Sequence, residues 1–206
     1  MGLSVIYSAI PPSSNLYLRL QRDKALNTLV SFIFSDGFGV FHFFEIAPED
    51  IEESLENIVD VYSEVFKSKL DVELIVAELQ SELTLTRQTS PGIEYRTAML
   101  EKSSEAIKQR LVQQLSRKQV ANAEEVVQKL LFGDRIFAPN LASPDEYDSL
   151  NLISRKLVRE GASFFRQIDP TTLFTQEDRY LQDLEELRDL YLGADEHNEV
   201  ILVGLC

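Results

Sequence analysis

His42 and Glu45 lie three residues apart in an aromatic stretch and form the first pair of side chains that could do chemistry. A histidine and a carboxylate can act as an acid–base pair or bind a metal ion. On a strand, however, successive side chains point to opposite faces, so these two do not face each other. A histidine packed among Phe41, Phe43 and Phe44 explains the pattern better. We therefore keep His42, Phe44 and Glu45 as candidate ligand-binding residues and predict no catalytic residue, metal ligand or cofactor.

The other reactive side chains stand near the C-terminus. His197 follows Asp195 and Glu196 in an acidic turn, which would hold its proton but offers too few fixed ligands for a transition metal. Cys206 is the only cysteine, so no intramolecular disulfide can form, and the adjacent terminal carboxylate disfavours the thiolate that a nucleophile needs. A single thiol is consistent with a reducing compartment, and we expect a cytoplasmic protein.

Acidic residues are concentrated between Glu45 and Glu64, where eight carboxylates occur without a lysine or arginine. Paired carboxylates could hydrolyse a substrate or bind a divalent cation, but a solvated helix face is the commoner explanation. The chain contains no calcium-loop, phosphate-loop, nucleophile-elbow or zinc-protease motif. Most known catalytic classes therefore have no support in the sequence.

Charge is distributed unevenly along the chain. The formal net charge of -14 opposes binding to nucleic acid or to an anionic membrane surface. The segment from Arg87 to Lys118 has the opposite sign, with seven basic and three acidic residues. Three interpretations are open: a solvated amphipathic helix, a docking face for an acidic partner, or self-association with the acidic helix at Glu45 to Glu64.

Hydrophobic periodicity and capping signals predict the elements that position these residues. In the N-terminal part we expect a strand over Leu3 to Ile10, a helix capped by Ser13 or Ser14 and reaching Ile33, a strand over Val40 to Ile46, and an acidic helix from Pro48. From Lys69 to Phe132 the pattern is helical and broken by Ser90-Pro91-Gly92, which predicts an antiparallel helical hairpin.

The C-terminal part has its own signals, with Ser143 and Pro144 placed to start a helix. We expect that helix to reach about Glu160, followed by a short strand over Ala162 to Ile168, a helix over Gln176 to Leu192, and a strand over Val200 to Leu205. Few strands and many helices predict a single α+β domain over residues 1–206, with N-terminal, central and C-terminal strands in a small sheet covered by helices. The helical hairpin at about 69–132 is then an insertion, and the strand order is not indicated.

Three stretches resemble a known family. Asp23 to Leu29 is similar to an early helix motif in which Leu26 replaces a tryptophan, Phe44 to Ile51 is similar to a strand-to-helix junction, and Leu184 to Tyr191 is similar to a final amphipathic helix. Together they resemble the YfbM-like family of uncharacterised bacterial proteins, over about half of the chain at its two ends. The resemblance implies an α+β fold and a bacterial cytosolic protein, and it brings no established activity.

From the acidic composition and the missing catalytic motifs we expect a non-catalytic protein-interaction domain that binds a basic protein partner, such as a nuclease toxin. The alternative is a small-ligand-binding protein or enzyme with a pocket near the aromatic strand at residues 41–44. A homodimer formed through the helical hairpin is a third hypothesis. We expect neither nucleic acid nor membrane as a partner.

Overall fold

Two apolar runs at opposite ends of the chain form the centre of the sheet. The computed structural model describes residues 4–22, 26, 27, 30, 97–100, 102–138, 150–175 and 179–205. Strand β1 (Val5–Ile10) pairs antiparallel with β5 (Val200–Leu205) along its whole length, and every residue of both strands is buried. A strand buried on both faces reads as a continuous apolar run, and this is why the sequence predicted both strands.

Three shorter strands complete an antiparallel sheet in the order β2-β1-β5-β4-β3. Strand β2 (Thr97–Leu100) pairs with β1, β4 (Leu150–Ile153) pairs with β5, and β3 (Arg135–Ala138) pairs with β4. Helices and an antiparallel sheet together confirm the predicted α+β fold class.

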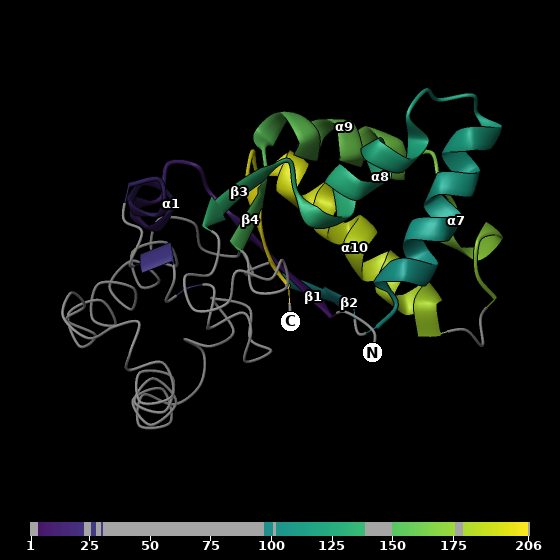
Figure 1. Ribbon diagram of the computed structural model, residues 1–206, viewed down its shortest axis with the longest axis horizontal. Helices are drawn as coiled ribbons and strands as arrows, with labels where there is room; N and C mark the ends of the chain where they lie inside the picture. The colour runs from purple at the N-terminus through teal and green to yellow at the C-terminus, as the bar shows by residue number, and fades with distance from the viewer. Residues whose placement is uncertain are drawn as a thin grey trace.

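Helices cover one face of the sheet (Figure 1): α8 (Ala123–Phe132), α9 (Arg155–Phe165) and α10 (Arg179–Glu196) pack on the strands, and α7 (Ser104–Arg117) packs against α8 and α10. A short 3-10 helix, η2 (Pro170–Thr172), lies between α9 and α10 in the chain. Alternate residues of β1, namely Val5, Tyr7 and Ala9, face this layer and belong to its core. The short helix α1 (Asn15–Leu20) lies on the other side of the sheet in Figure 1 and is capped by Ser14, as predicted.

Two buried tyrosines tie the C-terminal end of α8 to the sheet and to α10. The last carbonyls of a helix have no partner within the helix. The Tyr7 hydroxyl donates to the Leu131 carbonyl oxygen at 2.9 Å, and the Tyr191 hydroxyl donates to the Leu130 carbonyl oxygen at 2.5 Å. Burial raises the pKa of both hydroxyls well above the ordinary tyrosine value, so both remain donors. Two elements distant in sequence thus satisfy one helix end.

The chain leaves α8 through a position that only glycine can occupy. Gly133 has a φ of +92°, and a Cβ atom there would lie 2.8 Å from the carbonyl oxygen of Leu152. The next residue, Asp134, donates its backbone N–H to the same Leu152 oxygen at 2.9 Å, which leads the chain into β3. Close approach of two backbones therefore fixes where α8 ends and β3 begins.

The structure corrects four predicted elements. The helix that was predicted to reach Ile33 ends at Leu20 as α1, with a turn after it. Strand β2 lies inside the interval from Lys69 to Phe132 that was predicted to be a helical hairpin, so this part of the interval belongs to the sheet. Strand β4 and a helix start at Arg155 replace the predicted helix that would reach Glu160, and the predicted strand at Ala162 lies within α9. In the other three cases, pairing with a neighbouring strand, or a cap at Ser154, overrides an ambiguous apolar pattern.

Candidate functional site

The predicted ligand-binding residues His42, Phe44 and Glu45 lie outside the described residues, as does the acidic stretch at Glu45 to Glu64. The pocket predicted near the aromatic strand at 41–44 therefore stays a prediction. Within the described ranges, no group of three or more histidine, cysteine, aspartate or glutamate side chains could hold a metal ion. Candidate sites in the described part of the chain come from other residues.

The last turn of α10 holds an ion-pair cluster, so Asp195 and Glu196 belong to the helix and only His197 lies in the turn that follows it. His197 is exposed there, while the carboxylate of Asp195 accepts hydrogen bonds from the guanidinium groups of Arg155 and Arg166, each at 3.0 Å. Burial raises the pKa of Asp195, but the hydrogen bonds from Arg166 and Arg155 outweigh it and hold that pKa below the ordinary aspartate value. This cluster fastens both ends of α9 to the end of α10. Its role is structural, because both acceptor oxygens are already engaged.

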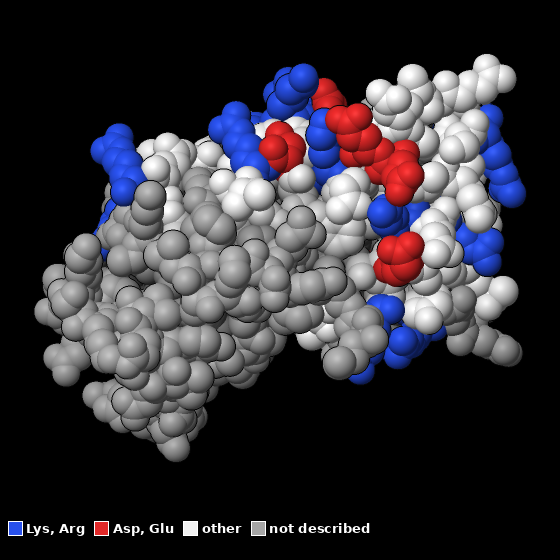
Figure 2. All heavy atoms as spheres, viewed as in Figure 1, with Lys and Arg blue, Asp and Glu red and all other residues white. Residues whose placement is uncertain are grey.

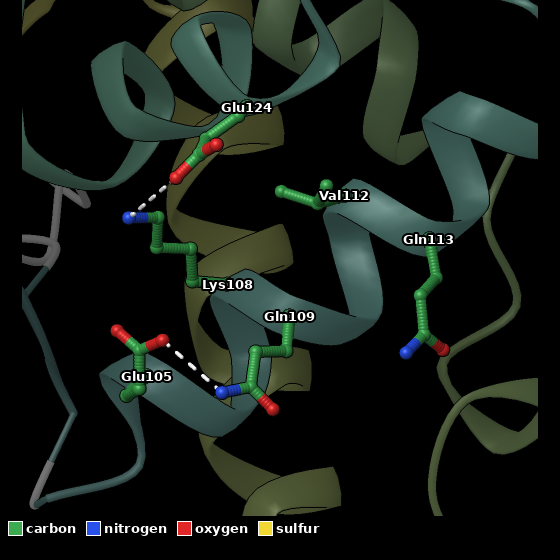
Figure 3. A pocket seen from close by; sticks show the side chains of 6 residues that line it. All are labelled: Glu105, Lys108, Gln109, Val112, Gln113 and Glu124. Carbon is green, nitrogen blue, oxygen red and sulfur yellow. Dashed lines mark hydrogen bonds and ion pairs between the residues drawn. The ribbon is translucent and has the colours of Figure 1, made fainter.

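An open hollow of about 320 Å³ lies between α7 and α8 (Figure 3). Its lining comes from both helices: Glu105, Lys108, Gln109, Val112, Gln113 and Glu124. The Lys108 ammonium lies 3.5 Å from a Glu124 carboxylate oxygen and links the two helices, and the Gln109 amide donates to Glu105 at 3.2 Å. Exposed pairs of this kind contribute little energy and exchange readily for a partner's groups.

The lining of this hollow is mostly polar and charged. None of its lining residues is a histidine, cysteine, serine or threonine, so the lining has neither a hydroxyl or thiol nucleophile nor an imidazole base. Val112 is its one apolar contributor, whereas small-molecule pockets are mostly apolar.

On another side of α7, two aromatic rings contact each other, and each ring also contacts one arginine side chain. The guanidinium carbon of Arg110 lies 6.0 Å from the centre of the Phe174 ring, and that of Arg179 lies 5.2 Å from the centre of the Tyr180 ring. The two rings meet edge to face with centroids 5.7 Å apart. We call Arg110, Phe174, Tyr180 and Arg179 the arginine–aromatic cluster. Sequence reasoning placed Arg110 in a basic segment but missed the cluster, because α7 meets Phe174 only in the fold.

Comparison of the chain with known proteins gives no match that could assign a role to these surfaces. No family model matches the chain, and no curated protein and no solved structure is significantly similar to it. The resemblance to the YfbM-like family therefore stays a prediction. Among the helices that the structure describes, none is both long enough and apolar enough to cross a membrane.

Proposed function

We propose that this protein is a non-catalytic, cytoplasmic protein-interaction domain that binds a basic protein partner. One observation carries the proposal: the chain's surplus of negative charge comes from residues other than those that the structure describes. Of the chain's 20 basic and 34 acidic residues, the described residues include fifteen basic and thirteen acidic ones, which leaves five basic and twenty-one acidic residues elsewhere. The described residues thus have a small surplus of base, and the whole surplus of acid belongs to the other residues.

A segregated surplus of one sign favours a charged macromolecular partner. Over the described helices, basic and acidic side chains are interleaved (Figure 2), so their fields largely cancel beyond a Debye length of about 8 Å at physiological salt. The acidic residues elsewhere include the base-free stretch from Glu45 to Glu64, whose eight carboxylates do not cancel. Such a field accelerates association with a basic surface and rejects acidic ones.

The described candidate sites support binding rather than catalysis. In the hollow between α7 and α8, Lys108 pairs with Glu124 and Gln109 with Glu105. In the ion-pair cluster, the Asp195 carboxylate accepts hydrogen bonds from two arginines. Neither presents an activated nucleophile or a tuned acid–base pair. We also propose, from the resemblance of three stretches, a bacterial origin and a relationship to the YfbM-like family.

The proposal is tested by native mass spectrometry of the protein purified gently from its own host. We expect a co-purifying basic protein, whose affinity for the chain falls as salt is raised. Two triple variants then locate the contact by removing equal charge. In one, three glutamates of the acidic stretch become glutamine: Glu52, Glu53 and Glu56. In the control, three exposed glutamates of the described helices become glutamine: Glu160, Glu186 and Glu196.

We expect the first triple variant to bind at least about tenfold more weakly and the control to bind nearly as the wild type does. A chain that carries no protein partner, or a complex whose affinity does not respond to salt, would refute the proposal. A small bound molecule in the same spectrum would favour the alternative pocket near residues 41–44.

A further inference from the structure

We propose that the arginine–aromatic cluster is a docking surface for carboxylate side chains of a second copy of this chain. Arg110 and Arg179 are both exposed, and within the described part of the chain neither makes an ion pair or a hydrogen bond. Some other cations of the helical layer contact carboxylates, namely Lys108, Lys129, Arg155, Lys156, Arg166 and Arg188, whereas Arg117 and Arg159 also make no ion pair within the described residues. The two cluster arginines differ from these cations because each contacts an aromatic ring, Phe174 or Tyr180.

Each guanidinium of the cluster lies over an aromatic ring, 6.0 Å from the ring centre for Arg110 and 5.2 Å for Arg179. A guanidinium that packs against an aromatic face keeps its N–H groups directed outward from its edge, where they can bind a carboxylate through two parallel hydrogen bonds. Phe174 is nearly buried, with 6% of its surface exposed, so it is a fixed support for Arg110. Less side-chain entropy is then lost when a partner binds than for a freely rotating arginine.

The composition of the rest of this chain makes a second copy complementary in charge to the cluster. The residues outside the described ranges have twenty-one acidic and five basic side chains, so a second copy brings the carboxylates that the cluster needs. The net charge of -14 on each copy opposes association at long range. At about 0.15 M salt, however, charges beyond about 8 Å are screened, so the local sign at the contact decides.

Sedimentation velocity of the full chain over a range of micromolar concentrations, at about 0.15 M salt, tests the proposal. We expect reversible self-association that is weakened about tenfold or more by the double variant Arg110→Gln and Arg179→Gln. The matched control is Arg135→Gln and Arg159→Gln, which removes two exposed arginines outside the cluster and changes the net charge equally. Circular dichroism of both variants checks that the fold is retained.

A second measurement identifies the occupant. A synthetic peptide with the sequence of residues 45–64 should compete with self-association, and the same peptide with its eight acidic residues replaced by Gln and Asn should not. A wild-type chain that stays monomeric, or equal weakening by both double variants, would overturn the proposal. Binding of a single-stranded RNA oligonucleotide to a monomer, lost only in the cluster variant, would overturn it in favour of a nucleic-acid surface. Because these readouts need no basic partner, they can fail independently of the proposed function.

Discussion

The substitution Gly161→Ala tests how α9 and α10 pack. Gly161 is buried in α9, and an added Cβ atom would lie 2.3 Å from Cε1 and 2.7 Å from Cδ1 of the Tyr191 ring. It would also lie 2.9 Å from a methyl carbon of Leu130. Ordinary contacts begin at 3.4 Å, so the ring must retreat by about 1 Å. The Tyr191 hydroxyl would then lose the Leu130 carbonyl to which it donates.

Opposing effects determine how much Gly161→Ala changes the free energy of unfolding. Replacing glycine by alanine inside a helix normally stabilises it by about 1 kcal/mol. Overpacking of a core costs about 1–3 kcal/mol, and a buried carbonyl left without a donor costs about 1–3 kcal/mol more. The net expectation is a loss of about 1–5 kcal/mol in the free energy of unfolding. In a chain of this length, that loss lowers the melting temperature by about 2–20 °C.

The assay is urea denaturation followed by far-ultraviolet circular dichroism, since the chain has no tryptophan to report unfolding. The same substitution is measured again in a Tyr191→Leu background, where the ring is gone and alanine should be neutral or stabilising. The double-mutant cycle should give a coupling free energy of at least about 2 kcal/mol. If Gly161→Ala stabilises the wild type, or costs the same in both backgrounds, the packing argument is wrong.

Two further substitutions test polar contacts. Tyr7→Phe removes the donor to the Leu131 carbonyl at the end of α8 and should cost about 1–3 kcal/mol in urea denaturation; a loss below about 0.5 kcal/mol would contradict it. Asp195→Asn should cost about 1 kcal/mol at neutral pH. Because the folded-state pKa of Asp195 is depressed, its contribution is present above the unfolded value near 4 and lost as the pH falls through the folded value. The variant should therefore lose less stability than the wild type below about pH 5, and parallel pH profiles would rule out the ion-pair cluster as a source of acid sensitivity.

The elements that the sequence predicted are those with strong local signals. Strands β1 and β5 are continuous apolar runs, the cap at Ser14 lies just before its helix, and α10 has a long apolar stripe. Each signal lies within a window of a few residues, so neighbours along the chain are enough to specify the element.

The predictions of secondary structure are wrong where contacts with distant parts of the chain determine the element. Strand β2 reads Thr-Ala-Met-Leu, and three of these residue types are good helix formers, yet pairing with β1 makes the segment a strand. The contacts at the candidate sites have the same origin. Arg155 reaches Asp195 across 40 residues of sequence, and Arg110 meets Phe174 only because α7 packs near the start of α10. A single sequence contains no period or spacing that indicates such pairs.

The two proposals assign different binding partners to the same group of carboxylates. A basic partner would neutralise the acidic residues outside the described scaffold, and a second copy would use residues of the same group to contact the arginine–aromatic cluster. If both proposals hold, the two associations compete, because a carboxylate already paired with one cation gives little to a second. The basic partner would then dissociate the homodimer by mass action, and the homodimer would lower the apparent affinity for that partner by the same coupling free energy. Opposite local charges on one chain could thus link its oligomeric state to the presence of its partner.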